Sequence, residues 1–557
     1  MGLIMRIQKI KINNYRCFDG EFVLELNSGI NILVGNNEAG KSTILEAIHL
    51  ALSGLINGRY LRNELSQYFF NTATVARYLE SLQTATHLPP PTISIELFFE
   101  GGPNPALAML EGNGNSDSVK GCGVWYVIEF DEKYQAEYET LIKTAAAAGE
   151  PINSIPIEYY TVTWKHFGRE GITARTIPIK SALIDSSSAR IQSGSDIYIS
   201  RIIRDNLDEK ERVEISQAHR QLKEAFMDKP SVKAINTKIN KSASITNKEV
   251  RISVDLTTQN AWEAHLITYL NDVPFHHVGK GEQSIVKTNL AMSHKKALEA
   301  NVILLEEPEN HLSHVRLNEL IKKISEGIGE KQLIISTHSS FVVNKLGLDW
   351  LIFLHDAKTT KLNALSKDTE AFFKKLSGYD TLRLILCNKA ILVEGDSDEL
   401  VVQKAYKDKH GKLPIEDGVD VISVGTSFLR FLEIADKVNK PVAIVTDNDG
   451  DVAAATKKYD DYLGANAKKN ITICFDATVD TGTLKIGAKA KEFNYNTLEP
   501  KLLKANNLKT LNMILGTEFK TDDELHIHMK ANKTECALKI FESNEPIKFP
   551  QYILDAI

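Results

Sequence analysis

Residues 35–42 read GNNEAGKS and match the whole phosphate-binding pattern G-x-x-x-x-G-K-[ST]. The apolar run 30–34 before it predicts a buried strand, and residues 41–52 after it predict a helix. The glycines permit a tight loop whose backbone N–H groups face phosphates at the positive end of that helix. An α/β nucleotide-binding fold follows, with Lys41 on the β/γ-phosphates and Ser42 on Mg²⁺. The expected ATP-binding residues are Asn36, Asn37, Gly40, Lys41, Ser42 and Thr43.

A second group of nucleotide-site residues follows a buried strand predicted over 302–305. The next residues are Glu306, Glu307, Pro308 and Glu309. A carboxylate at a strand end can hold Mg²⁺ through water, and its neighbour can orient the attacking water. We expect Glu306 in the first role and Glu307 in the second. Taken alone, this stretch could be a solvated acidic turn, but a further predicted strand, 332–336, leads directly into Thr337-His338-Ser339.

Residues 279–283 read GKGEQ and precede an apolar helix predicted over 285–292, which makes another anion-binding helix start. Together with NNYRCF at 13–18, these motifs resemble the RecF and SMC branch of the ABC ATPases. The resemblance implies that His338 is the switch residue at the γ-phosphate, and that the signature loop covers the nucleotide of the opposite subunit. Lys280 replaces the family's usual serine, so Lys280 and Gly281 are expected at that phosphate. The glutamine loop stays open between Gln67 and Gln83.

The C-terminal part carries two acidic motifs, each after a predicted buried strand. Strand 391–393 leads into Glu394-Gly395-Asp396-Ser397-Asp398, and strand 442–445 leads into Thr446-Asp447-Asn448-Asp449-Gly450. Carboxyl ends of strands in α/β sheets are where ligands bind. In an extended segment, Asp447 and Asp449 would share one face and could chelate one ion. Because clustered negative charge is costly, these carboxylates are expected to require Mg²⁺ or Mn²⁺.

The order E-G-x-x-D followed by D-x-D closely resembles the Toprim domain of topoisomerases, primases and nucleases. A Toprim domain behind a RecF-like cassette resembles the OLD (overcoming lysogenization defect) family over nearly the whole chain. The resemblance is greatest to class 2 members, which include the nuclease subunit of the Gabija antiphage system. It implies metal ligands at Glu394, Asp398, Asp447, Asp449 and Glu499, with Lys533 steadying the transition state and Lys530 as the alternative lysine.

From this resemblance we expect an ATP-regulated, metal-dependent DNA endonuclease or nickase that acts in antiphage defence by two-metal hydrolysis. Its cofactors would be ATP and Mg²⁺ or Mn²⁺, and its partners DNA, further copies in a homodimer or homotetramer, and a second defence protein such as a UvrD-like helicase. One alternative is an ATP-dependent DNA-binding scaffold or sensor that does not cut. Another is a nuclease effector of a retron-type system. The DNA-contacting lysines would be Lys485, Lys489, Lys491, Lys501 and Lys504.

The organisation of the chain follows from these motifs. We expect the first half of the ATPase at 1–189, a helical dimerisation insertion at 190–248, the second ATPase half at 249–385 and the Toprim domain at 386–557. The insertion is rich in charges and has apolar residues at helical spacing. The stretch 101–123 is rich in Gly, Asn and Ser and predicts a surface loop.

Composition limits the class of protein. The chain of 557 residues is too long for one core, and its 43% apolar and 25% charged residues are typical of globular proteins. A net charge of −6 gives no global basic surface, so DNA would need a local basic patch. Five scattered cysteines, an odd number without metal-ligand spacing, argue against disulfides and zinc sites. The sequence shows neither a signal peptide nor a membrane span, so a cytoplasmic location is expected.

Overall fold

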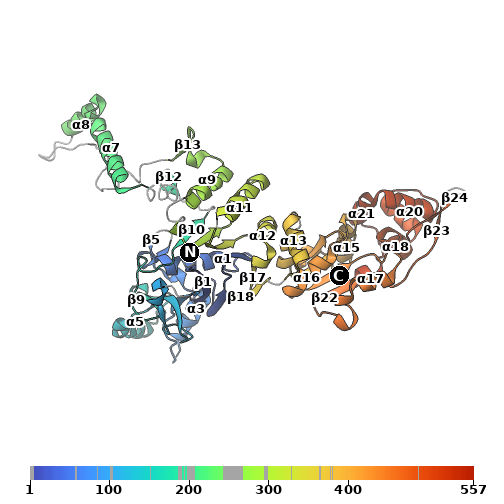
Figure 1. Ribbon diagram of the computed structural model, residues 1–557, viewed down its shortest axis with the longest axis horizontal. Coiled ribbons are helices and arrows are strands. Elements are labelled where there is room, and N and C mark those ends of the chain that lie inside the picture. Colours follow the sequence, from blue (N-terminus) through green and yellow to red (C-terminus); the bar gives the residue numbers. More distant parts are fainter. Residues whose placement is uncertain are drawn as a thin grey trace. The chain divides into compact units, whose positions relative to one another are not determined.

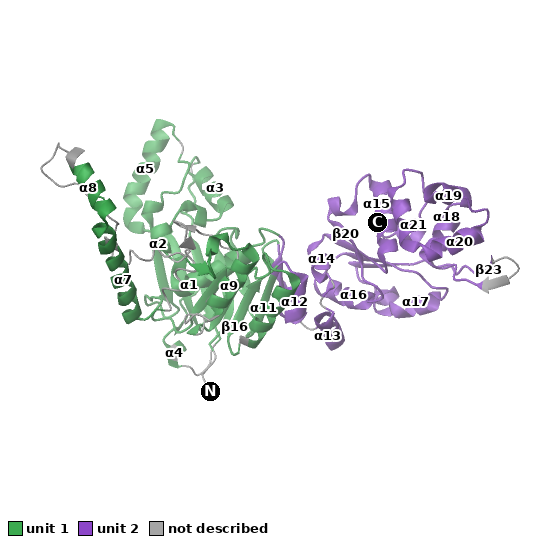
Figure 2. Ribbon diagram, turned by 90° about the horizontal axis from the view of Figure 1, so that it is seen from above, with its two compact units in different colours: residues 1–33, 37–337, 356–358 green, residues 34–36, 338–355, 359–557 purple. Residues whose placement is uncertain are grey.

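The computed structural model describes residues 5–56, 59–84, 86–100, 105–150, 152–185, 191–192, 195–196, 207–242, 252, 268–293, 299–327, 329–362, 365–376, 378, 380–486 and 489–557. These residues form two compact units (Figure 2). Unit 1 comprises 1–33, 37–337 and 356–358, and unit 2 comprises 34–36, 338–355 and 359–557. Each unit is described separately.

A parallel sheet in unit 1 carries the nucleotide-site motifs. Its strands lie in the order β10 (Ser181–Asp185), β15 (Val302–Glu306), β16 (Gln332–Ser336) and β3 (Ile30–Gly35). Nearly every residue of β3, β15 and β16 is buried, as expected for a sheet covered on both faces. Helix α1 (Lys41–Ser53) begins where the glycine-containing loop ends and buries its apolar residues from Ile44 onward. The strand, loop and helix predicted from the sequence are confirmed.

A second, antiparallel sheet in unit 1 contains β2 (Glu21–Glu25), β1 (Ile7–Asn13), β6 (Ile93–Phe99), β8 (Gly121–Phe130) and β7 (Glu111–Gly112), and β9 (Tyr160–His166) pairs with β8 on the same edge as β7. The surface loop predicted over 101–123 is wrong in several places, since α4 (Pro105–Ala108) and β7 lie within it, Leu107 and Leu110 are buried, and β8 begins at Gly121. Gly123 lies so close to the Phe167 ring and the Leu97 carbonyl that a Cβ there would overlap both. This glycine serves close packing inside a strand rather than a turn.

The predicted insertion 190–248 is helical over most of 209–242, and its residues 190, 193–194, 197–206 and 243–248 lie outside the described residues. Helix α7 (Glu209–Asp228) begins with a capping box between Asp208 and Glu211, and α8 (Pro230–Ser242) follows it (Figure 1). The exposed apolar side chains of these two helices include Val213, Leu222, Phe226 and Ile235.

The other helices of unit 1 are α2 (Leu61–Glu64), α3 (Thr72–Ser81), α4 (Pro105–Ala108), α5 (Gln135–Ala148), α9 (Lys280–Ser293) and α11 (His314–Gly327). Its short strand pairs are β4 (Leu55–Ile56) with β5 (Arg59–Tyr60), β11 (Ile191–Gln192) with β12 (Ser195–Asp196), and β13 (Tyr269–Leu270) with β14 (Val273–Pro274).

Unit 2 is built on a four-stranded parallel sheet in the order β20 (Val419–Ser423), β19 (Lys389–Val393), β21 (Val442–Val445) and β22 (Ile471–Cys474). Its crossover helices are α15 (Asp396–His410), α16 (Phe428–Lys437) and α17 (Val452–Lys458). The chain leaves β19 toward β20 on one side, and later places β21 on the other side. The sheet therefore has a topological switch point between β19 and β21.

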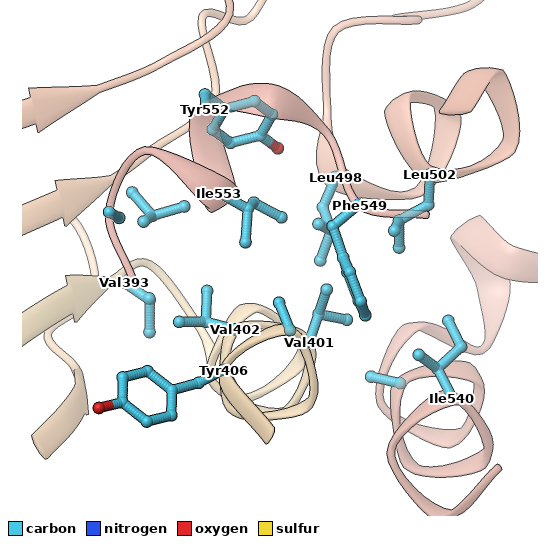
Figure 3. Packing of buried hydrophobic residues seen from close by; sticks show 14 of the residues in the cluster. Val393, Val401, Val402, Tyr406, Leu498, Leu502, Ile540, Phe549, Tyr552 and Ile553 are labelled. Atoms are coloured by element: carbon cyan, nitrogen blue, oxygen red, sulfur yellow. The ribbon is translucent and has the colours of Figure 1, made fainter. Parts of the chain in front are cut away.

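One apolar core lies under this switch point. It joins the strands to α15, α18 and the residues before the end of the chain, and Figure 3 shows ten labelled members. The other elements of unit 2 are α12 (Ser340–Leu346), α13 (Lys367–Lys375), α14 (Thr381–Leu386), α18 (Leu498–Ala505), α19 (Leu508–Leu515), α20 (Asp522–Ala531), α21 (Lys533–Glu542), α22 (Gln551–Leu554), β17 (Leu351–His355) and the hairpin β23 (Thr483–Ile486) with β24 (Lys489–Glu492); β18 (Lys358–Lys361) begins on the last residue of unit 1.

Two expectations about the chain as a whole can be compared with the structure. All five cysteines are free thiols, as their odd number and spacing predicted. No helix in the described ranges is both long and apolar enough to cross a bilayer.

Candidate functional site

The phosphate loop of unit 1 presents a buried lysine at the start of α1. Gly40 caps the helix with φ 95°, and a Cβ there would overlap the Phe18 ring, so the tight turn requires glycine. Lys41 is only 5% exposed. Burial lowers its pKa, while the carboxylates of Glu307, Glu309 and Glu306 oppose that change. A desolvated ammonium surrounded by carboxylates and helix N–H groups suits a phosphate-binding position.

Glu306 ends β15 beside the same loop. Its carboxylate forms a hydrogen bond with the Ser42 hydroxyl. Burial raises the pKa of Glu306, and repulsion from Asp185, Glu307 and Glu46 raises it further, whereas the hydrogen bond with Ser42 lowers it. Ser42 and Glu306 are thus adjacent, which is the pair that a Mg²⁺ between the phosphates and the strand end would need. Asp185 stands opposite Glu306 in the register of β10 and β15. The sequence did not predict that Asp185 lies at the nucleotide site, because Glu306, its neighbour on the adjacent strand, is far from it along the chain.

Glu307 adopts a left-handed backbone conformation, with φ 38°. A non-glycine residue in this region costs energy, and such positions cluster at functional sites. Its Oε2 accepts a hydrogen bond from Asn310 Nδ2 at 2.8 Å. Glu309, the third acidic residue of the motif, accepts from the Thr337 hydroxyl at 2.6 Å. The Glu309 carboxylate therefore links the ends of β15 and β16, a contact not predicted from the sequence.

The remaining predicted nucleotide residues lie at loop and helix ends. Asn36, Asn37 and Ser42 are exposed, Thr43 is partly buried, and His338 is exposed just after β16. Lys280 is the first residue of α9 and is exposed. Gly281 packs directly on the backbone carbonyl of His311, so any Cβ there would overlap it. The signature glycine therefore has a structural reason within this chain, while contacts of Lys280 with a nucleotide stay a prediction.

The two acidic motifs of unit 2 meet at the switch point of its sheet. Glu394 follows β19 directly, and Asp447 follows Thr446 at the end of the neighbouring strand β21. Asp398 lies in the first turn of α15, where its Oδ2 accepts from the Gly395 backbone N–H at 3.1 Å. The switch point is where ligands bind in such sheets. The order of the strands thus brings together motifs that lie far apart in the sequence.

Electrostatics shows how crowded this cluster is. Burial, with repulsion from Asp398, Glu499, Asp449 and Glu394, raises the pKa of Asp447 to about 8. The pKa of Asp398 is raised to about 6, mainly by burial, while its hydrogen bond from Gly395 and the Lys533 charge lower it. Asp447 is therefore repelled by all four of the other predicted carboxylates.

Glu499 and Lys533 complete this cluster from the helical part of unit 2. Glu499 lies on α18 with only 5% exposure, and its Oε1 is 3.3 Å from Lys533 Nζ at the start of α21. Burial lowers the pKa of Lys533, but Glu499, Asp447 and Asp398 outweigh that effect and raise it overall. The alternative lysine, Lys530, lies over the Phe493 ring instead, with 5.1 Å from Nζ to the ring centroid. The geometry favours Lys533 of the two.

The D-x-D motif is shaped differently from the extended segment assumed for the sequence. Asp449 has φ 49° and lies in a turn, so the alternation that would align it with Asp447 does not apply. Asn448, which is buried, fixes the turn by donating to the carbonyls of Asp476 and Thr478. Asp449 is exposed and accepts from Asn494 Nδ2 at 3.1 Å. The two aspartates therefore do not share one face of an extended segment.

The donor set fits Mg²⁺ or Mn²⁺. Carboxylate oxygens are the ligands these ions prefer, and Mg²⁺ usually keeps several waters and binds through one or two carboxylates plus substrate phosphates. Among the described residues, no group of three or more His, Cys, Asp or Glu side chains is arranged to hold a metal ion. That finding disfavours an all-protein cage and is compatible with an open, water-rich Mg²⁺ site.

The predicted DNA-contacting lysines behave differently from one another. Lys501 was wrongly expected on the surface: it is 4% exposed and its Nζ is 2.7 Å from both Asp476 and Asp480. Lys504 is exposed but pairs with Asp480 at 2.5 Å. Lys485 is exposed on β23. The side chains of Lys489 and Lys491 lie outside the described residues. Lys501 is buried because α18 places it between Asp476 and Asp480. The residues next to it in the sequence do not predict these ion pairs.

Two family models match the chain, one in each of its two predicted domains. Residues 9–377 match the family model described as AAA domain, and residues 385–449 match the TOPRIM domain of the Overcoming lysogenization defect protein-like family. No curated protein sequence matches the chain. Similar solved structures include RecF with ATP, the recombination mediator of the RecFOR pathway (12% identity, 64% of this chain and 98% of that chain, TM-score 0.33), and the SMC head domain from Thermotoga maritima (12%, 65% and 99%, TM-score 0.27).

The matched domains define the class: an AAA-type ATPase domain followed by a Toprim domain, which is the combination of an ATP-dependent nuclease. The AAA domain over most of the chain, followed by an OLD-like TOPRIM domain, supports a nuclease of the OLD (overcoming lysogenization defect) family. The fold class predicted from the sequence is thereby confirmed. The narrower resemblance to class 2 members, including the Gabija nuclease subunit, stays a prediction.

Proposed function

We propose that this protein is an ATP-regulated DNA endonuclease or nickase whose cutting site is the carboxylate cluster of unit 2. The observation that carries the proposal is the convergence of Glu394, Asp398, Asp447 and Glu499 at the switch point, with Lys533 3.3 Å from Glu499. Bound Mg²⁺ or Mn²⁺ supplies an activated water and Lewis-acid stabilisation at such a site. Asp447 and Asp398, whose carboxylates repel each other when no metal ion is bound, would hold the ions.

The protein's own groups have distinct parts in phosphodiester hydrolysis. Glu394 and Asp449 extend the ligand set on the exposed side of the cluster, and the buried Glu499 extends it from α18. Lys533 carries a positive charge beside Glu499 and would offset charge that develops on the scissile phosphate. The raised pKa of Lys533 keeps it protonated throughout the physiological range.

ATP is proposed to regulate cutting through unit 1. Lys41 and Ser42 would bind the phosphates and Mg²⁺, Glu306 would hold that ion, and Glu307 would orient the attacking water. His338 and, from a second copy, Lys280 and Gly281 would contact the γ-phosphate. The exposed apolar residues of the α7–α8 hairpin support the insertion as the contact between copies in a homodimer or homotetramer.

Plasmid nicking tests the proposal. Purified protein is incubated with supercoiled plasmid and Mg²⁺ or Mn²⁺, with and without ATP. Glu394→Ala and Asp447→Ala are expected to abolish nicking while leaving ATP binding unchanged, because each removes a metal ligand from unit 2 only. Asp417→Ala, which changes a carboxylate that pairs with Lys412 away from the cluster, is the matched control and should cut normally. Full nicking by Asp447→Ala would refute the assignment.

The biological setting is proposed from the family. An antiphage role in the cytoplasm, with a partner such as a UvrD-like helicase, agrees with the domain combination. Phage plating on cells with and without the gene, and with the Asp447→Ala variant, tests that role. Equal plaque numbers on all three would contradict antiphage defence without affecting the enzymatic proposal.

A further inference from the structure

A small pocket in the helical part of unit 2 plays no part in the proposed chemistry. Helices α18 and α20, which supply most of it, pack against each other (Figure 1). The cavity has a volume of about 240 Å³, below the roughly 300–1,000 Å³ of pockets for drug-sized ligands. It therefore suits one planar ring rather than a whole nucleotide. Its lining includes Asp480, Tyr495, Leu503, Lys504, Asp522 and His526.

Hydrogen bonds join this pocket to the turn that carries Asp449. Asn494 donates through Nδ2 to Asp449 Oδ1 at 3.1 Å, and Tyr495, the next residue, lines the pocket. The side chain of Asn496 then exchanges two hydrogen bonds with the backbone of Asp480, at 2.7 and 2.9 Å. Because consecutive Cα atoms are about 3.8 Å apart, the pocket begins one short step of the chain from a proposed metal ligand.

Helix α18 gives a similar spacing. Glu499, in its first turn, belongs to the carboxylate cluster, and Leu503, four residues later, lines the pocket. A rise of 1.5 Å per residue separates them by about 6 Å along the helix axis. A DNA strand whose phosphate lies at the cluster can therefore reach the pocket with the base of a neighbouring nucleotide.

The aromatic lining favours a planar ligand that forms hydrogen bonds. The rings of Tyr495 and His526 meet edge to face with 5.2 Å between their centroids, and Phe493 packs against both. His526 is 6% exposed, and its Nδ1 has no hydrogen-bond partner among the described residues. Buried polar atoms in proteins are nearly always hydrogen-bonded, so an orphaned one needs an explanation. A ligand in the pocket that bonds to Nδ1 would supply it.

The charges of the pocket favour a neutral ligand over a phosphate. Burial lowers the pKa of His526, against the charges of Asp522 and Asp523, so the imidazole is neutral at physiological pH. Of the described residues that line the pocket, only Lys504 is a permanent cation, and its Nζ pairs with Asp480 at 2.5 Å. Carboxylates repel phosphates but accept hydrogen bonds from the amino groups of bases, as they do from cytosine N4.

We propose that this pocket binds one unpaired nucleobase of the DNA strand that the carboxylate cluster cuts, with the base packed on Tyr495 and hydrogen-bonded to His526. The inference deepens the proposed nuclease function and rests on it. A base inside a duplex reaches such a pocket only when it is extruded, so the preferred substrate carries an unpaired base beside the scissile phosphate. Packing on an aromatic ring contributes about 5- to 150-fold in affinity per base.

Removing a single base tests the contact, because an abasic site keeps the phosphate and the sugar. The cut is first mapped by nicking with the wild-type protein. Duplex oligonucleotides that span it then carry, at each position around the cut, either a mismatched base or an abasic site. Their dissociation constants are measured by fluorescence anisotropy with Mg²⁺ and the Asp447→Ala protein, which is expected not to cut.

Three further substitutions are each added to the Asp447→Ala protein. Tyr495→Leu removes the ring of the pocket, and Tyr495→Phe keeps it. Phe519→Leu is the matched control: the Phe519 ring lies 5.1 Å from that of His528 on the same helix α20, but Phe519 is not among the described residues that line the pocket. Should Tyr495→Leu not fold, His526→Phe, which keeps a ring and removes Nδ1, is measured in its place.

We expect one position at which loss of the base weakens binding about tenfold in the Asp447→Ala protein and in its Tyr495→Phe and Phe519→Leu derivatives. After Tyr495→Leu or His526→Phe the same loss should cost at most about twofold, because the contact is already gone. The wild type should also cut faster where that position is mismatched than where it is paired.

An effect of base loss that is the same with and without Tyr495→Leu would overturn the inference, as would its absence at every position. Binding of free dCMP that depends on Tyr495, without any effect of base loss, would also overturn it, because the occupant would then be a free nucleotide. Asp447→Ala separates the two proposals. If Asp447→Ala still cuts, the cutting site is wrong, whereas an inactive Asp447→Ala without a base effect that depends on Tyr495 refutes only the pocket.

Discussion

Replacing Asp447 with asparagine should stabilise unit 2 when no metal is present. The pKa of Asp447 is raised from 3.8 to about 8, so the folded protein binds this proton more tightly than the unfolded chain. The penalty of folding around this group is absent below pH 3.8, grows as the pH rises, and is complete near pH 8. At about 1.4 kcal/mol per pKa unit, the upper limit at pH 7.5 is about 5 kcal/mol. Since neighbouring carboxylates share the repulsion, we expect about 2–4 kcal/mol from Asp447→Asn.

Hydrogen exchange of β19 and β21 measures this effect inside unit 2, whatever the behaviour of unit 1. In EDTA at pH 7.5, slowly exchanging amides of these strands should exchange about 30- to 1,000-fold more slowly in Asp447→Asn than in wild type. At pH 5.5 the difference in opening free energy should fall to about half, because the wild-type carboxyl still holds its proton there. Added Mg²⁺ should protect the wild type and leave the variant nearly unchanged.

Asp417→Asn is the matched control, because the shift in the pKa of Asp417 on folding has the opposite sign to that of Asp447. Lys412 and Tyr406 lower the pKa of Asp417, so its ionised form favours folding and the asparagine should not stabilise unit 2. If Asp447→Asn exchanged no more slowly than wild type in EDTA at pH 7.5, Asp447 would not be a strained carboxylate. If Mg²⁺ protected both proteins equally, Asp447 would not be a metal ligand.

Further predictions concern the ATPase and the lysines. Lys41→Ala should weaken ATP binding at least tenfold by equilibrium dialysis, whereas Glu307→Gln should bind normally and hydrolyse slowly; equal turnover by Glu307→Gln and wild type would remove Glu307 from catalysis. Lys280→Ser should lower the ATPase rate even at saturating protein concentration, and superimposed curves would make Lys280 a surface residue. Lys501→Ala should destabilise unit 2 by about 3 kcal/mol in urea, because it leaves two partly buried carboxylates unpaired, while Lys504→Ala should cost under about 1 kcal/mol and weaken DNA binding instead.

The parts of the fold that the sequence predicted well are those decided by local pattern. The strand before GNNEAGKS, its helix α1, and strands β15, β16 and β21 appear within a residue or two of the predicted bounds. Each strand is a continuous apolar run that is followed at once by a polar motif. The end of the buried run and the start of the motif therefore predict the same strand end. The beginning of β8 was missed because Gly121 and Gly123 are turn residues by local preference. The Phe167 ring that requires Gly123 lies elsewhere in the sequence.

The candidate cutting site could be predicted in its membership but not in its shape. The acidic motifs identified Glu394, Asp398, Asp447 and Asp449, while the conformation of Asp449 depends on Asn448 and Asn494. No local pattern reveals that Asn448 bonds two carbonyls near residue 477, or that Lys501 is buried between two aspartates.

The arrangement of unit 2 explains why its carboxylates can be tolerated without metal. Four of the predicted ligands are attached to different elements: the ends of β19 and β21, the first turn of α15, and α18. Each element is fixed by the apolar core below, so repulsion cannot simply spread the side chains apart. The strain is instead expressed as raised pKa values at Asp447 and Asp398, which means that protons occupy the site in the absence of cations. A divalent ion must displace those protons, so metal binding should release protons and strengthen as the pH rises from about 6 to 8. A core that prevents the carboxylates from separating therefore couples the stability of unit 2 to the cation that its proposed chemistry requires.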